Sequence, residues 1–230
     1  MNPDADQQAT VAVIDDDTIV REGLRALMPM HRVTCAFEHH SEFLAERPSV
    51  DLVVLDLNLD GVGQAATRHG ATAIADVRDA GYPVLIYTNE NRRLVLAGCL
   101  AAGADGVIHK TQSLQELADA ITAVRNGQTV ITPALTGLAE AIDRYGHLPA
   151  LTPRQRQVLA GRARGKTFRR VASELGISEK MAHEHMSAVT TKFANYLRTH
   201  SPTDLERTLG LAQGDLLHRP TVEESSRPSA

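Results

Sequence analysis

The sequence has little cysteine and no long hydrophobic segment, and both absences narrow the classes of protein that it could encode. Its two cysteines, Cys35 and Cys99, lie far apart and outside any Cys/His cluster, so we expect neither a disulfide nor a zinc site. The apolar stretches fall well short of the ~20 residues that a membrane-spanning helix needs. The sequence has no internal repeat, and it starts with MNPDADQQ rather than with a basic, hydrophobic leader. We therefore expect a folded, cytoplasmic protein without a membrane segment.

Charge is unevenly distributed along the chain. Residues 1–130 carry roughly −8 and residues 150–200 roughly +7, although the net charge of all 230 residues is only −4. This length allows two ordinary domains. The sequence therefore predicts an acidic first half joined to a basic module.

Apolar runs alternate with helical patterns through the first half, as in VAVI, LVVL, VLIY and GVI with amphipathic segments between them. This alternation predicts an α/β fold over residues 10–130, with a five-stranded parallel sheet doubly wound by helices, after a flexible N-terminus at 1–9. Residues 131–149 contain two prolines and two glycines and predict a linker with one brief helix. A small all-α helix-turn-helix domain is expected at 150–212, and a disordered tail at 213–230.

Polar side chains follow the ends of four apolar runs. Asp15 and Asp16 follow VAVI, Asp56 follows LVVL, Thr88 follows VLIY, and Lys110 follows GVIH. Because the carboxyl ends of parallel strands meet at one edge of a sheet, we expect these side chains to share one pocket.

The chemistry of this predicted pocket suits phosphoryl transfer. Asp15 and Asp16 offer the carboxylate oxygens that Mg²⁺ prefers, and the cation would relieve their mutual repulsion. Asp56 could attack phosphorus as a carboxylate nucleophile and form an acyl phosphate. Thr88 would donate a hydrogen bond to one phosphoryl oxygen, and Lys110 would neutralise part of the added charge.

Residues 11–130 resemble the receiver domain of two-component response regulators. The segments that carry the resemblance are VAVIDDDTIVREGLRAL, DLVVLDLNLDG, VLIYTNE and AAGADGVIHKT. The resemblance implies that Asp56 is the phosphoacceptor, and that the backbone carbonyl of Asn58 joins Asp15, Asp16 and Asp56 around Mg²⁺. It also implies that the side chains of Asn58 and Glu90 set the phosphoryl lifetime, which we expect to be short.

The chain departs from the receiver pattern at two positions near the predicted pocket. Val107 stands where the family usually has an aromatic residue, three positions before the lysine. Asp60 stands where a proline usually follows the phosphoacceptor, and the next residues, GVGQAATRHGA, suggest a lengthened loop. The first departure means that the family's coupling between a threonine and an aromatic side chain cannot operate unchanged.

The basic module begins with the signals of a helix-turn-helix. Thr152, Pro153 and Gln155 predict a helix start with a capping box. Gly165 closes that helix, and the turn LGIS leads from a second helix to a third that Ser178 caps. A fourth helix is expected after Phe193.

The third predicted helix has two distinct faces. The spacing of its apolar residues predicts a buried face made of Ala182, Met186, Val189 and Phe193. The opposite face could lie in the major groove of double-stranded DNA and read base edges through Lys180, His183, Glu184, Ser187 and Thr191. Phosphate contacts are expected from five neighbouring cations, which are Arg162, Arg164, Lys166, Arg169 and Arg170. The alternative is a helical pair with a solvated basic surface.

Residues 151–197 resemble the LuxR/NarL-type helix-turn-helix. The matching features are LTPRQRQVL, VASELGISEK, His185, Val189 and Lys192. The family commonly has threonine and valine where Met181 and Ala182 stand, and a basic or amide residue where Glu184 stands. The resemblance implies a DNA-binding output domain of a NarL/FixJ-type regulator.

Together these features predict a transcriptional response regulator rather than an enzyme. A histidine kinase or a small phosphodonor would phosphorylate Asp56, and phosphorylation would promote homodimerisation and promoter binding. One alternative is an atypical receiver that is controlled by a ligand or protein partner without phosphorylation, which Val107 and Asp60 favour. A remote alternative is a haloacid-dehalogenase-like phosphatase, but in that family the nucleophile follows the first strand and precedes an acid by two residues, whereas Asp56 follows a later strand and precedes Asn58 by two.

Overall fold

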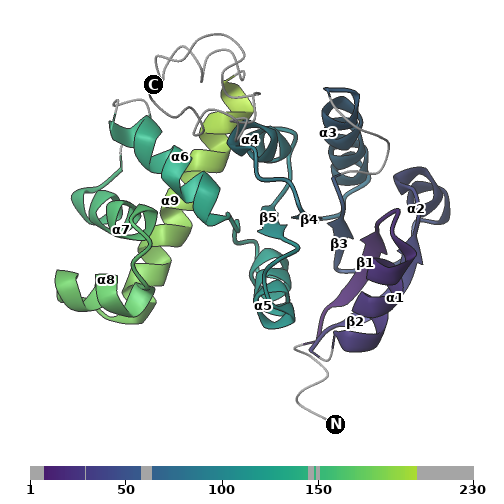
Figure 1. Cartoon of the computed structure of the whole chain (residues 1–230), viewed down its shortest axis with the longest axis horizontal. Coiled ribbons are helices and arrows are strands. Elements are labelled where there is room, and N and C mark those ends of the chain that lie inside the picture. The colour runs from purple at the N-terminus through teal and green to yellow at the C-terminus, as the bar shows by residue number, and fades with distance from the viewer. Residues whose placement is uncertain (1–7, 29, 58–63, 145–147, 149–150, 201–230) are drawn as a thin grey trace, which may run out of the picture.

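The computed structural model of the protein describes residues 8–28, 30–57, 64–144, 148 and 151–200. A sheet covered by helices on both faces forms one half of the molecule, and a group of helices lies beside it (Figure 1). The termini, residues 1–7 and 201–230, lie outside the described residues. The tail that was predicted to be disordered, residues 213–230, is part of this undescribed segment.

The first half is built on a five-stranded sheet in which every pairing is parallel. Its order is β2-β1-β3-β4-β5, with β1 at Thr10–Ile14, β2 at Arg32–Phe37, β3 at Leu52–Leu55, β4 at Val84–Thr88 and β5 at Gly106–His109. All residues of β3 and β4 are buried, as expected for central strands that are covered on both faces. The predicted five-stranded parallel sheet is confirmed.

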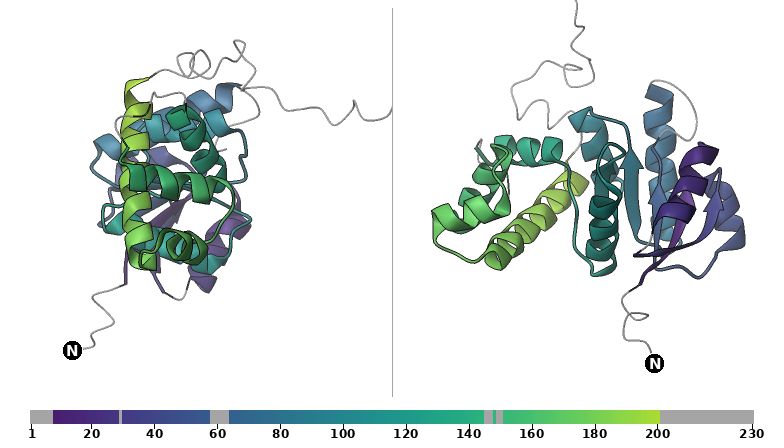
Figure 2. Two further views of the ribbon diagram at one scale, coloured as in Figure 1. Left: turned by 90° about the vertical axis from the view of Figure 1, so that its left-hand side faces the viewer. Right: turned by 60° about the horizontal axis from the view of Figure 1, so that its bottom comes forward.

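Helices cover both faces of the sheet, which confirms the doubly wound fold. On one face α1 (Thr18–Leu27) and α5 (Leu114–Arg125) pack against side chains such as Val13 and Leu85. On the other face α2 (His40–Glu46), α3 (Gln64–Asp79) and α4 (Arg93–Ala101) pack against side chains such as Val53 and Ile86. The second view of Figure 2 shows the sheet between these helices.

The helix-turn-helix half consists of α7 (Pro153–Ala163), α8 (Phe168–Leu175) and α9 (Glu179–Thr199). The capping box of α7 is present, because the Thr152 hydroxyl accepts from the Gln155 N–H at 3.3 Å and the Gln155 side chain accepts from the Thr152 N–H at 3.0 Å. Gly176, with φ of 64°, ends α8 in the left-handed conformation, and Ser178 caps α9. These predicted helix ends are confirmed.

Two segments differ from the sequence-based expectation. Residues 133–144 form a three-turn helix, α6 (Pro133–Arg144), which buries Leu135, Leu138 and Ile142. A fourth helix was expected in the segment after Phe193, but α9 continues without interruption to Thr199 and so includes the start of that segment. The remainder of the segment, from residue 201 onward, lies outside the described residues.

The two halves share one buried cluster of side chains. Helix α4 of the first half packs against both α6 and α9, and α6 packs against α7. Leu96 of α4, Leu138 of α6 and Phe193 of α9 all belong to the same hydrophobic core. The two halves therefore contact each other through α4, and Figure 1 shows α4, α6 and α9 together at this junction.

Candidate functional site

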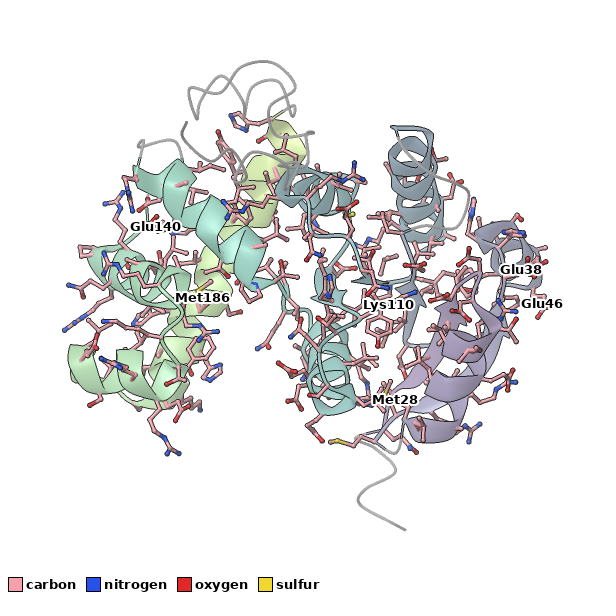
Figure 3. The ribbon with its side chains drawn as sticks, in the orientation of Figure 1. Met28, Glu38, Glu46, Lys110, Glu140 and Met186 are labelled. Atoms are coloured by element: carbon pink, nitrogen blue, oxygen red, sulfur yellow. The ribbon has the colours of Figure 1, made fainter. Side chains whose placement is uncertain are left out.

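The carboxyl edge of the sheet gathers the polar side chains that follow the strands. Asp15, Asp56 and Lys110 come directly after β1, β3 and β5, and Thr88 is the last residue of β4. Carboxylate oxygens of Asp15, Asp16 and Asp56 all lie within 4.8 Å of one another. We use the name acidic pocket for five residues together, namely Asp15, Asp16, Asp56, Thr88 and Lys110. Figure 3 labels Lys110 in this half of the molecule.

Lys110 lies between the two buried carboxylates of the acidic pocket. Its Nζ is 2.8 Å from Oδ2 of Asp15 and 3.3 Å from Oδ2 of Asp56. The pKa of Lys110 is raised because these carboxylates together outweigh the burial of the ammonium, which on its own is the largest effect and lowers the pKa. The lysine therefore stays charged and holds Asp15 and Asp56 side by side.

Asp56 is an almost fully buried carboxyl group. Its side chain is only 4% exposed, and its Oδ1 accepts from the N–H of Leu57 at 2.8 Å. Burial raises the pKa of Asp56, the charge of Asp15 raises it further, and Lys110 opposes both effects. A carboxylate that is poorly solvated in this way keeps a reactive lone pair, as a nucleophile requires.

The raised pKa of Asp56 predicts a pH-dependent cost in stability. The folded state binds the proton of the Asp56 carboxyl group more tightly than the unfolded chain does. The contribution of this group to the free energy of unfolding is therefore present at low pH and is lost as the pH rises through the raised pKa. Asp56→Asn, which cannot lose a proton, should therefore stabilise the fold more at neutral pH than at a pH near the ordinary aspartate pKa of about 3.9. Urea unfolding in the presence of a chelator measures this difference, with Asp119→Asn on the exposed face of α5 as the control. A gain that shrinks with rising pH would contradict the assignment.

The hydroxyl of Thr88 is engaged with the loop that follows its own strand. It accepts from the backbone N–H of Glu90 at 3.1 Å. The Glu90 carboxylate in turn accepts from the backbone N–H of Arg92 at 2.7 Å and from Nε of the same arginine at 2.9 Å. Glu90, which we expected to influence the phosphoryl lifetime, is thus held by Arg92 in this structure. Asn58 and Asp60 lie outside the described residues.

Three further residues contribute to the acidic pocket and were not singled out from the sequence. The N–H of Asp17 donates to Oδ1 of Asp15 at 2.9 Å, and the guanidinium of Arg21 donates to the Asp15 carbonyl. The ring of Tyr87 lies 5.9 Å from Nζ of Lys110. Arg21 follows the N-cap Asp17 by four residues, so one helical turn brings it back to this loop. This four-residue spacing is the signal in the sequence that could have identified Arg21 as a neighbour of the acidic pocket.

The helix-turn-helix half presents the expected two faces of α9. Ala182, Met186, Val189 and Phe193 are buried. On the opposite face Ser187 is partly exposed, and the other members are exposed, namely Lys180, His183, Glu184 and Thr191. The His183 ring stacks on Phe168 of α8 at 3.7 Å between centroids, so its orientation is fixed.

Most of this face of α9 borders the first half of the molecule. A cavity of about 430 Å³ is lined on one side by Lys180, His183, Glu184 and Ser187. On the other side it is lined by residues at and after the end of α5, including Gln128 and Thr129. The face of α9 that we expect to read DNA is therefore turned toward the first half in this conformation. Met186, labelled in Figure 3, also lines the cavity.

Several of the expected phosphate contacts are held in ion pairs. Lys166 and Arg170 both pair with Glu174, at 2.5 and 3.2 Å, and Arg169 lies 3.9 Å from Glu179. These pairs are largely exposed, so their partners can exchange at little cost. Arg162 instead lies over the Phe168 ring, 4.3 Å from its centroid.

Comparison with known proteins places both halves in established families. Residues 11–122 match the model of the response regulator receiver domain, and residues 149–206 match that of the bacterial regulatory proteins of the luxR family. The transcriptional regulatory protein UhpA of Salmonella typhimurium is 30% identical over 188 residues, which cover 80% of this chain and 90% of that protein. The chain is a response regulator of the NarL/FixJ family.

Other relatives of this response regulator agree with that assignment. The nitrate/nitrite response regulator NarL of Escherichia coli is 27% identical over 199 residues, covering 81% of this chain and 89% of NarL. A solved structure of the RcsB response regulator of Salmonella typhimurium has the same fold, with a TM-score of 0.50 at 21% identity, and the match covers 89% of this chain and 99% of RcsB. The response regulator is thus a DNA-binding transcription regulator with a receiver domain. None of the helices in its described residues is long and apolar enough to cross a membrane.

Proposed function

We propose that this response regulator is switched by phosphorylation of Asp56 and that the phosphorylated form binds promoter DNA as a homodimer. The phosphoryl donor would be a cognate histidine kinase or a small phosphodonor such as acetyl phosphate. The observation that carries the proposal is the placement of Lys110 between Asp15 and Asp56 at the carboxyl edge of the sheet. This edge presents a nucleophile, a fixed positive charge and a cluster of oxygen ligands together.

The acidic pocket fits Mg²⁺ because its oxygens are hard ligands that lie close together. Asp15, Asp16 and Asp56 would hold the ion, with the backbone carbonyl of Asn58 as a further candidate ligand. The bound ion would neutralise charge on the phosphoryl oxygens.

The protein's own residues would carry out the transfer. An oxygen of Asp56 attacks phosphorus, the bond from phosphorus to the donor breaks, and the donor leaves with the bonding electron pair. Lys110 then moves its charge from the carboxylates toward the new phosphoryl group. The Thr88 hydroxyl moves away from the Glu90 N–H, from which it accepts a hydrogen bond here, and donates its own hydrogen to a phosphoryl oxygen.

Release of α9 from the receiver is the second part of the proposed switch. Lys180, His183 and Glu184 line a cavity whose other wall belongs to the receiver, so the receiver stands on the side from which we expect duplex DNA to approach them. We infer that phosphorylation weakens the contact of α4 with α9 and α6, after which α9 can enter the major groove. RcsB of Salmonella, which has the same fold, has been solved bound to a promoter in the presence of the phosphoryl mimic beryllofluoride.

Beryllofluoride tests the switch without a kinase. With Mg²⁺ present, beryllofluoride should convert the response regulator from monomer to dimer, because the mimic occupies the phosphoryl position on Asp56. Size-exclusion chromatography with light scattering measures the mass, and fluoride without beryllium is the control. If the mimic binds but leaves the mass unchanged, the proposed coupling to dimerisation is wrong.

Failure to bind the mimic would instead support regulation without phosphorylation. The structural feature that favours this second candidate is Val107, which is 1% exposed and fills its place in the core with an aliphatic side chain. The phosphatase hypothesis is disfavoured by topology, because Asp56 follows β3 and not the first strand of the chain.

A further inference from the structure

His109, the last residue of β5, contains an unusual buried nitrogen. Within the described part of the chain, Nε2 of His109 is the one buried side-chain nitrogen or oxygen atom that has no hydrogen-bond partner. The backbone N–H of Thr111 donates to Nδ1 at 3.2 Å, and the Thr111 hydroxyl lies 2.7 Å from the same nitrogen. Nδ1 must therefore present its lone pair, which places the ring hydrogen on Nε2. A buried N–H group without an acceptor disfavours the conformation that contains it.

The position of His109 connects this unsatisfied group with the acidic pocket. His109 is the register partner of Thr88 on the neighbouring strand β4, and it directly precedes Lys110. Partners in adjacent parallel strands project to the same face of a sheet. The preceding partners, Ile86 and Val107, both belong to the core on the α4 side. With a period of two, Thr88 and His109 lie on that side as well.

The loop between Thr88 and α4 forms a chain of contacts that leads to the DNA-binding half. The Thr88 hydroxyl accepts from the Glu90 N–H, and Glu90 accepts from the backbone and guanidinium of Arg92. Arg92 is the N-cap residue of α4. Helix α4 is mostly buried and packs against α9. A change at Thr88 can therefore move the start of the helix on which α9 rests.

We propose that His109 is a positioning residue that couples Thr88 to α4. When the Thr88 hydroxyl leaves the Glu90 N–H, the loop of residues 89–91 loses one hydrogen bond but stays attached to Arg92 through Glu90, so it can shift and supply an acceptor to Nε2–H of His109. The conformation described here leaves this donor unsatisfied, so the donor favours the switched conformation. This inference rests on the proposed phosphorylation of Asp56, and it assigns the transmission of the signal to a side chain outside the acidic pocket.

Two substitutions separate hydrogen bonding by His109 from its role in packing. His109→Phe keeps a flat ring but removes the donor, whereas His109→Gln keeps an N–H donor on a side chain of similar reach. The experiment measures acetyl phosphate labelling of Asp56, and the gain in DNA affinity that beryllofluoride and Mg²⁺ produce. We expect labelling of His109→Phe to stay within about twofold of wild type, while its gain in DNA affinity falls about tenfold. His109→Gln should recover most of that gain.

The outcomes distinguish this inference from the function on which it rests. If the wild type responds to beryllofluoride and His109→Phe responds equally, His109 is only a packing residue and the inference is overturned. If His109→Phe does not fold, His109→Gln decides, because a folded and labelled glutamine variant without a response also overturns it. If the wild type neither takes up label nor responds, the proposed phosphorylation itself has failed, and the inference falls with it.

Discussion

Replacement of Asp56 by asparagine is expected to reduce labelling by acetyl phosphate to background. The amide that replaces the carboxylate is a poor nucleophile, and no other carboxylate of the acidic pocket has the same surroundings. Asp15 already accepts from Lys110 and from the Asp17 N–H, and Asp16 is exposed. Incorporation of radiolabel from acetyl phosphate, with intact-mass analysis, measures the effect.

The control for this substitution is Asp119→Asn. Asp119 is an exposed carboxylate on α5, and its side chain accepts from nearby Gln115 at 3.0 Å. Its removal changes the net charge equally but should leave labelling unchanged. Undiminished labelling of Asp56→Asn would show that the nucleophile is a different residue, whereas loss of labelling in both variants would indicate a general effect of charge.

Replacement of Lys180 by alanine is expected to weaken specific DNA binding by about 1–3 kcal/mol, or roughly 5- to 150-fold. Lys180 is exposed in the first turn of α9, where side chains of a helix in the major groove reach base edges. Affinity should be measured by fluorescence anisotropy in the presence of beryllofluoride and Mg²⁺. The probe is a DNA fragment that the wild-type protein has selected from a random pool.

Arg198→Ala provides a matched control because it removes one positive charge from the other end of the same helix. Arg198 is exposed in the last turn of α9, more than four turns from Lys180. Its loss should change affinity only slightly, through long-range electrostatics. Equal losses in the two variants would mean that α9 does not present its N-terminal turns to DNA.

Much of the fold could be predicted because its determinants are local in the sequence. Buried parallel strands produce continuous apolar runs such as LVVL, and Thr152 with Gln155 specifies a helix start through two hydrogen bonds between residues close in the sequence. The gathering of Asp15, Asp56 and Lys110 also followed from local patterns. Once the strands are parallel and adjacent, the residues after them must meet at one edge.

The extent of α6 was readable from the sequence but was underestimated. Pro133 and Gly137 suggested a linker between domains in which regular secondary structure is interrupted. However, proline is well tolerated at the start of a helix, and Leu135, Leu138, Ala139 and Ile142 have the spacing of one apolar helix face. The amphipathic pattern outweighs the single glycine, because burial of four side chains contributes more than the conformational cost of one glycine.

The hydrogen bonds of the loop between Thr88 and α4, and the arrangement of the two halves, could not be predicted in the same way. Glu90 could contact the acidic pocket or Arg92, and the choice depends on side-chain conformations that no periodicity encodes. The packing of α4 against α9 joins residues about 90 positions apart, and it depends on how well two surfaces fit. Sequence patterns describe which face of a helix is apolar, but they do not identify the partner that covers it.

The sharing of Glu174 between Lys166 and Arg170 has a consequence for the thermodynamics of DNA binding. Phosphate binding normally gains entropy because small ions leave the DNA, and the number of such ions sets how steeply affinity falls with salt. Here a carboxylate of the protein must also be displaced from two of the basic residues. Added salt weakens that internal pairing too, which offsets part of its effect on the complex. The affinity of this regulator for DNA should therefore depend less steeply on ionic strength than the number of basic residues near α9 suggests.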